Sequence, residues 1–271
     1  MWGSQVPRAR HGGVEETVSL GPDHRCAVEL PGTFFKWSAL FYPVLHPNWI
    51  RLIGLSFMST LAFLMVAGAA FVFSVIMRFG AFVSLFAVPT MAMGCLALVS
   101  YVVGCFVTVI EETANGDDRL DRLIDLSWWE TLPRFLATAG AAGVAVGLAV
   151  AATYPLRRWF VWNDFEMILI HRVIIFQAFP ILLITNLVDG SWLPIRSLLE
   201  TVRRLSRCIG YFVAFLLITA PFSIATDLAL AQLYQWNLAA ALFGAGPLGA
   251  AWLMFYGHWL GRLSRQLTAA E

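Results

Sequence analysis

The chain has 271 residues, of which 59% are hydrophobic and 13% are charged, and its formal net charge is +1. Soluble domains carry about 45–50% apolar and about 25% charged residues, so this composition excludes an ordinary soluble domain. The near-neutral charge gives no reason to expect nucleic acid or an acidic macromolecule as a partner. The lipid bilayer is the partner that the composition predicts.

Residues 1–50 are expected to form a cytosolic N-terminal tail. They begin with polar sequence and contain no apolar segment followed by a cleavage site, so they do not resemble a secretory signal. The later part, Phe34 to Leu45, is rich in aromatic residues and is predicted to lie along the membrane surface.

Long apolar blocks predict an all-α, polytopic transmembrane helix bundle in residues 51–261, followed by a cytosolic C-terminal tail in residues 262–271. Because the blocks are continuous and do not alternate in polarity, they exclude a β-barrel. The fourth span contains His171 and Arg172, which leave only a short uncharged stretch for a full crossing. The six expected spans are about 52–77, 81–110, 135–156, 167–188, 208–230 and 236–260.

Basic residues predict the orientation of the spans, because cytosolic loops are enriched in arginine and lysine. With a cytosolic N-terminus, the inner segments hold Lys36, Arg51, Arg119, Arg122, Arg134, Arg196, Arg203, Arg204, Arg207, Arg262 and Arg265, and the outer segments hold Arg78, Arg157, Arg158 and Arg172. Aromatic residues mark the expected interfaces, for example Trp49, Trp236 and Trp259. Both termini are therefore expected in the cytosol of a bacterial cell, with the chain in its cytoplasmic membrane.

Small residues recur every four positions in the third span, at Gly143, Gly147 and Ala151. Such a stripe lets helix backbones approach closely, and packing drives association inside lipid. The stripe is predicted to contact another helix of the same chain, with a second copy or another membrane protein as the alternative. A second glycine-rich segment, Gly244 to Gly249, has dinucleotide-loop spacing but lies within an apolar helix, which favours a flexible or kinked helix.

Four ionisable side chains fall within or beside the expected spans: His171, Arg172, Asp227 and His258. Charges in such places mark functional sites, but each of these lies near a helix end, from which it can reach the headgroups. Arg172 and Asp227 are both expected toward the outer side. They form the candidate intramembrane ion pair, either lining a small pathway or fixing helix packing.

The loop after the second span carries Asp118, Asp121 and Asp125, which share one face if the loop is helical. This D-x-x-D-x-x-x-D spacing resembles the first aspartate motif of UbiA-type membrane prenyltransferases. The resemblance implies that these carboxylates hold Mg²⁺ against a substrate diphosphate. That family has a second aspartate-rich motif, which the corresponding loop here, Asp189 to Arg207, lacks. The competing interpretation is a turn at Asn115-Gly116 and a solvated interfacial helix.

The same loop, with its E-T-A-N-G-x-D sequence, also resembles loops of uncharacterised bacterial multi-spanning proteins, a likeness that implies no activity. No catalytic constellation or cofactor motif is recognisable. The leading hypothesis is therefore a non-catalytic membrane component that acts in assembly, as a scaffold or as a permease subunit. The alternatives are an Mg²⁺-dependent prenyl or lipid-phosphate transferase using the aspartate loop, and a small secondary transporter using Arg172 and Asp227.

Overall fold

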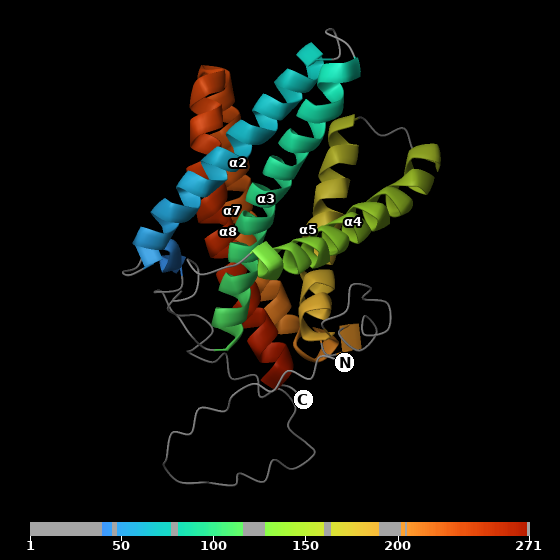
Figure 1. Ribbon diagram of the computed structural model, residues 1–271. Coiled ribbons are helices and arrows are strands. Elements are labelled where there is room, and N and C mark those ends of the chain that lie inside the picture. The colour runs from blue at the N-terminus through green and yellow to red at the C-terminus, as the bar shows by residue number, and fades with distance from the viewer. Residues whose placement is uncertain are drawn as a thin grey trace.

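The computed structural model describes residues 40–44, 48–76, 81–115, 128–159, 164–189, 202–203 and 205–269, and this part of the chain is all-helical (Figure 1). The elements are a 3-10 turn, η1 (Tyr42–Val44), and the helices α2 (Asn48–Ile76), α3 (Ala81–Ala114), α4 (Trp128–Trp159), α5 (Asp164–Asp189), α7 (Ile209–Trp236) and α8 (Leu238–Ala269). These 6 helices are each long and apolar enough to cross a membrane. The predicted polytopic helical bundle is confirmed.

The helices extend beyond the predicted spans at several ends. The last one continues to Ala269, well past the expected boundary near residue 260, and the fourth, α5, is 26 residues long. Prolines lie inside five of the helices, including Pro89 in α3 and Pro247 in α8. Membrane helices tolerate internal proline because neighbouring groups can satisfy the freed carbonyl.

Helix α8 is the centre of the bundle, since it packs against α2, α3 and α7 (Figure 1). Glycines allow this close packing. A Cβ atom at Gly261 would stand 2.6 Å from the Ile110 carbonyl oxygen of α3, and one at Gly246 would stand 2.6 Å from the Thr60 Cα of α2. Between them, the side chains of Ala250 and Met254 are fully buried. The apolar face of α8 is therefore shaped for backbone-to-backbone contact.

Helix α4 packs against this group of helices near its N-terminal end. Its first turns contact α3, where a Cβ at Gly104 would stand 2.7 Å from Thr131, and it then runs outward and packs along α5 (Figure 1). The buried face of α4 consists of Ala141, Ala145 and Ala149, all 0% exposed. The molecule is thus built from α2, α3, α7 and α8 on one side and the α4–α5 pair on the other.

Candidate functional site

The structure brings together the two residues of the candidate ion pair. Arg172 of α5 donates a hydrogen bond from Nη1 to Oδ2 of Asp227 on α7, over 2.5 Å. The two side chains are 63% and 52% exposed, and pairs this open contribute about 0–1 kcal/mol to stability. Because α5 packs along α4 and α7 packs along α8, the ion pair links two separate helix pairs.

One helical turn from Asp227, Ser223 occupies the same face of α7. Its Oγ accepts a hydrogen bond of 2.8 Å from Nε1 of Trp252 on α8, and it donates one of 2.9 Å to the Thr219 carbonyl oxygen. The indole of Trp252 is thereby held in a fixed orientation between α7 and α8. Ser223 and Trp252 were not among the residues selected from the sequence.

Below this point lies a cluster of rings that we call the aromatic box, centred on Tyr256 of α8. The Trp252 ring stacks on the Tyr256 ring at 4.8 Å, and the Phe176 and Phe215 rings meet it edge-on at 5.8 and 5.4 Å. The remaining members of the box are Phe106 at 6.3 Å and Phe179 at 6.5 Å. Four helices, α3, α5, α7 and α8, contribute rings, and aromatic pairs at such separations are worth about 0.5–1.5 kcal/mol beyond their burial.

Tyr256 itself is 1% exposed, and its hydroxyl makes no hydrogen bond to any described residue. A buried hydroxyl without a partner costs roughly 1–3 kcal/mol, so it marks a point where the box is not optimised for stability alone. Phe176 and Trp252, by contrast, are only partly buried. Tyr256 is therefore enclosed by the box, while its neighbours Phe176 and Trp252 remain partly accessible.

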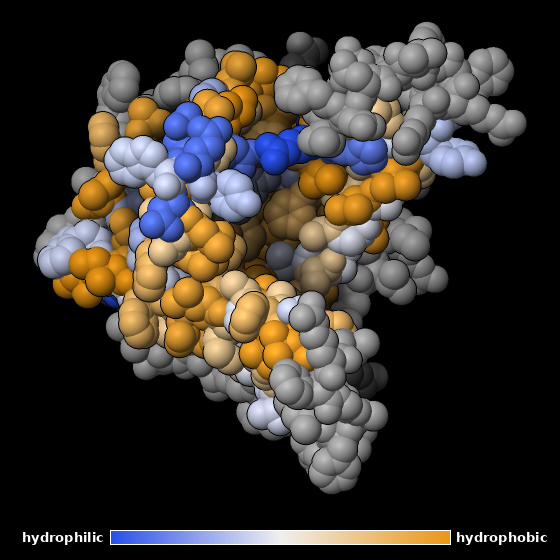
Figure 2. Space-filling view, turned by 90° about the horizontal axis from the view of Figure 1, so that it is seen from above, coloured by the Kyte–Doolittle hydropathy of each residue, from blue (hydrophilic) through white to orange (hydrophobic). Residues whose placement is uncertain are grey.

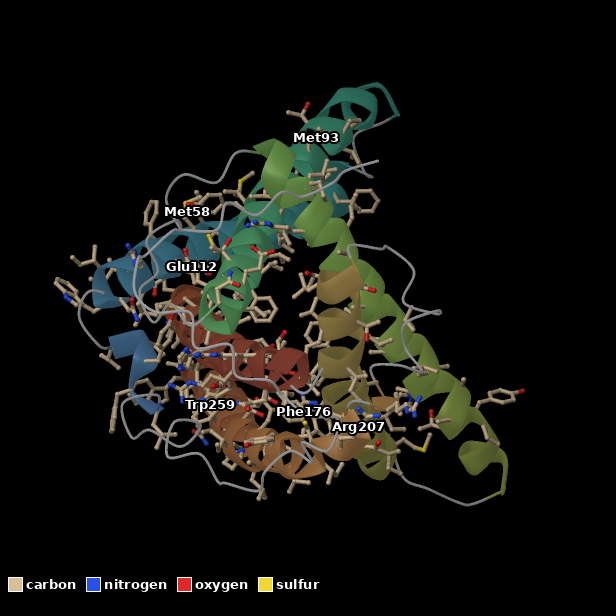
Figure 3. All side chains as sticks on the ribbon, turned by 90° about the horizontal axis from the view of Figure 1, so that it is seen from below. Met58, Met93, Glu112, Phe176, Arg207 and Trp259 are labelled. Carbon is tan, nitrogen blue, oxygen red and sulfur yellow. The ribbon has the colours of Figure 1, made fainter. Side chains whose placement is uncertain are left out.

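The charged pair and the aromatic box are aligned along the helices. Arg172, Phe176 and Phe179 have the spacing i, i+4 and i+7, which places them on one face of α5. One turn of an α-helix rises about 5.4 Å, so Arg172 lies about one turn above Phe176, the nearest ring of the box on α5. In Figure 3, Phe176 lies between α5 and α8.

The molecular surface is hollowed at one end of the bundle (Figure 2). Seen from above, the molecule is hollowed between hydrophobic walls, and hydrophilic residues gather along one side of the opening (Figure 2). The first turns of α5 and the last turns of α7 rise toward this face (Figure 1). We refer to this feature as the hollow. A hollow with hydrophobic walls and hydrophilic residues along one side can bind a molecule that has both polar and apolar parts.

Two further polar contacts fix the α3–α4 and α4–α5 junctions. Arg134 donates to Thr108 Oγ1 at 2.7 Å and to Glu111 Oε2 at 2.9 Å. His171 Nδ1 donates to the Met167 carbonyl oxygen at 2.8 Å, which leaves Nε2 to accept the Thr153 hydroxyl at 2.9 Å in the neutral tautomer. His171 thus joins α5 to α4.

His258 does not reach the headgroups, contrary to the sequence-based expectation. It is 1% exposed, its ring stacks on Tyr42 of η1 at 3.8 Å, and Nδ1 lies 3.2 Å from the Thr113 hydroxyl of α3. Trp259, expected at the interface, is likewise 0% exposed, whereas Trp236 at the end of α7 is 87% exposed. The reason is that η1 and α3 pack over this part of α8 and cover it.

The predicted packing stripe of the third span faces away from the other described residues. A Cβ atom at Gly143 or Gly147 would meet nothing within 4 Å, and Ala151 is exposed. The expected contact with another helix of the same chain is therefore wrong for the described residues. Alanines on the opposite side of α4 make that contact instead, and a contact of the stripe with a second copy stays a prediction.

The aspartates Asp118, Asp121 and Asp125 lie outside the described residues, so their Mg²⁺-binding role stays a prediction. Within the described part of the chain, no group of three or more histidine, cysteine, aspartate or glutamate side chains could hold a metal ion.

Comparison with known proteins adds no family or relative to this picture. No protein-family model matches the chain, and neither a curated protein nor a solved structure matches it significantly.

Proposed function

We propose that this protein is a non-enzymatic, permease-type component of a bacterial cytoplasmic membrane, and that it binds a small molecule in the hollow. The observation that carries the proposal is the Arg172–Asp227 pair, which lies one turn above the aromatic box on the facing sides of α5 and α7. Charges within membrane spans are rare and concentrate where polar molecules are bound or passed. A scaffold would need neither the charges nor the opening between hydrophobic walls.

The arginine bias supports an orientation with both termini in the cytosol. The end of α8 lies at the lower end of the molecule in Figure 1, and Figure 2 views the opposite end. Under this orientation the hollow opens to the outer side of the membrane. A cysteine at Asn163 should then react with a membrane-impermeant thiol reagent in intact cells, whereas cysteines at Gly116 and Ser197 should be protected. The reverse pattern would invert the proposed orientation.

Farther along the same face of α5 the side chains are closely packed. The exposed fraction falls to 0% at Leu183, and Phe215 and Leu260 are also 0% exposed. Among the described residues this packing fits a binding site reached from one side of the membrane.

Thiol accessibility tests this proposal without knowledge of the ligand. Phe176→Cys and Leu183→Cys would be exposed in intact cells to a charged methanethiosulfonate reagent, and labelled peptides identified by mass spectrometry, which separates the new thiols from the native cysteines. We expect labelling at position 176 from the outer side and none at position 183. No labelling at position 176 from either side would contradict a ligand-accessible hollow. The scaffold hypothesis would then be the leading one.

A further inference from the structure

The α4–α5 hairpin is held firmly at one end and loosely at the other. Toward the C-terminal end of α5, residues 182–186 are all buried, and Asn186 Nδ2 donates a hydrogen bond of 3.1 Å to the Ala137 carbonyl oxygen of α4. In the N-terminal half of α5, none of the side chains that the structure describes is buried, and Arg172 is exposed. The hairpin is therefore anchored at the end where α5 finishes and α4 begins.

We call the loosely packed end the hairpin tip, and it comprises residues 148–159 of α4 and 164–179 of α5. Within the tip the two helices are joined, because the Thr153 hydroxyl pairs with His171 Nε2 at 2.9 Å. Helix α4 also packs against α3, but that contact is made near Thr131, at the other end of the helix. The C-terminal end of α4 lies at the outer edge of the molecule in Figures 1 and 3. The tip therefore contacts the rest of the bundle chiefly through α5.

Two kinds of contact hold the tip against α7 and α8. The Phe176 and Phe179 rings lie 5.8 and 6.5 Å from the Tyr256 ring. Nearer the end of the tip, Arg172 pairs with Asp227, and because both side chains are more than half exposed the pair is weakly held. The Tyr256 hydroxyl, enclosed by the rings, makes no hydrogen bond to any described residue. Water that reached this hydroxyl would satisfy it, which offsets part of the cost of separating the rings.

A proline and two glycines lie where the tip begins. Pro180 of α5 has no N–H, so the Phe176 carbonyl oxygen lacks its regular helical hydrogen bond, and helices bend at such points. The antiparallel register set by the two hydrogen bonds between α4 and α5 places Gly143 at the level of Pro180. A Cβ at Gly143 or Gly147 would meet nothing within 4 Å, so close packing does not require these glycines, and they make α4 easier to bend. Both helices are thus weakest at the same level.

We propose that the hairpin tip is a gate, which tilts away from α7 and α8 about Pro180 and Gly143, and that the Arg172–Asp227 pair is the latch that holds it closed. Opening separates Phe176 from Tyr256 and admits water to the tyrosine hydroxyl. This motion goes beyond the proposed function, because it does not require that the hollow binds a molecule.

The rate of thiol modification measures the opening. With the full chain in nanodiscs, Phe176→Cys is treated with a charged methanethiosulfonate reagent, and mass spectrometry of the labelled peptides separates the new thiol from the native cysteines. The rate is divided by that of Val173→Cys in the same background, since Val173 is 48% exposed on the same tip. This ratio cancels changes in the local concentration of the reagent. For the otherwise unchanged chain we expect a ratio below one.

Reversing either charge of the latch should open the gate. Arg172→Asp and Asp227→Arg each replace an attraction by a repulsion, so the ratio should rise at least about fivefold. The two substitutions together restore an ion pair and should return the ratio to within about twofold of the original, which misfolding cannot imitate. Arg203→Asp, at an exposed arginine in the segment that precedes α7, is the control and should leave the ratio unchanged. An unchanged ratio in both single variants, or a high ratio in the double variant, would overturn the latch.

The hinge is tested in the background of the open variant Asp227→Arg. Pro180→Ala restores an N–H to the backbone of α5, so it should stiffen the helix and lower the ratio at least about twofold. Pro89→Ala is the matched control, because it removes a proline from inside α3 and should leave the ratio as it is. Equal ratios for the two proline variants would contradict a hinge at Pro180.

The same thiols separate the gate from the proposed function. If Phe176→Cys is labelled from the outer side at a rate that no latch variant changes, the gate is excluded and the permease-type proposal stands. If Phe176→Cys is labelled only in the latch variants, the gate is supported and a hollow that is accessible at rest is contradicted. No labelling at position 176 in any variant contradicts both.

Discussion

Glycines at four-residue spacing occur in α4 and in α8, and they have opposite environments. In α8, Gly257 and Gly261 face α3, where an added Cβ would stand 3.2 Å from Phe106 and 2.6 Å from the Ile110 carbonyl oxygen. In α4, an added Cβ at Gly143 or Gly147 would meet no atom within 4 Å. The same spacing therefore permits close packing without specifying it, because inside lipid the fit of the partner surface decides which helices associate.

The partner surfaces explain the difference. Helix α8 meets three neighbours, so its small residues are used on more than one side: Gly246 faces Thr60 of α2, and Gly261 faces Thr113 of α3. Helix α4 packs against α3 near its start and along α5 farther on, and its buried face includes Ala141, Ala145 and Ala149. Its glycines lie on the remaining side. Substitutions on the two helices can therefore show which glycines are needed for helix packing and which only share the same spacing.

The largest effect is expected for Gly261→Leu. A leucine side chain would have to displace the backbone of α3, because the nearest atom is the Ile110 carbonyl oxygen and not a flexible side chain. We expect a loss at or above the upper end of the ~1–3 kcal/mol usual for overpacking, with little monodisperse protein in detergent. Fluorescence-detected size exclusion and thermal unfolding measure this. Gly210→Leu is the control, since a Cβ there meets nothing within 4 Å, and equal behaviour of the two variants would contradict the α3–α8 contact.

Ala145→Leu should have the next largest effect. Ala145 is 0% exposed in the α4–α5 contact, and the added atoms must push the two helices apart. We expect a destabilisation of about 2 kcal/mol, within the range for small-to-large changes in a packed core. Thermal unfolding in detergent would show it as a lowered midpoint. A midpoint equal to that of the wild type would mean that α4 does not use its alanine face.

A smaller loss is expected for Gly246→Ala. The new methyl group would overlap Thr60, including its backbone nitrogen, but alanine also favours the helix over glycine by about 1 kcal/mol. The overlap lowers the stability and the helix preference of alanine raises it, and the free energy of unfolding should fall by about 1 kcal/mol in total. Gly249→Ala has the same gain in helix preference and an ordinary 3.7 Å contact with Phe63, so it should be neutral or stabilising. If both variants gain stability equally, α2 and α8 are farther apart than described.

The smallest effect is expected for Gly143→Leu and Gly147→Leu. Both positions are open, so unfolding in detergent should change by less than about 0.5 kcal/mol, in contrast to the destabilisation that the sequence pattern suggested. Multi-angle light scattering checks the alternative role of this stripe. A wild-type dimer that becomes monomeric in both variants would show that the stripe binds a second copy, whereas a clear loss of stability in the monomer would contradict the outward orientation of these glycines.

The features that depend on composition and chain length could be predicted from the sequence. Six apolar blocks were enough for the spans, and Arg172 and Asp227 could be paired because both were ionisable and expected at the same membrane depth. The aromatic box could not be predicted, since Phe106, Phe176, Phe215 and Tyr256 come from four helices whose neighbours no periodicity reveals. His258 was misplaced for a related reason: distance from an expected helix end says nothing about which neighbours cover that end.

The packing of α8 also bears on the order in which the chain can acquire its structure during synthesis. The chain emerges N-terminal end first, so α2, α3 and α7 enter the membrane before α8, the helix against which all three pack. Neighbouring helices such as α4 and α5 can associate as soon as both are made. Thr113 and Tyr42, however, gain their contacts with His258 only when α8 arrives. Closure of the bundle is therefore a late event, and until then the grooves that receive α8 are filled by lipid.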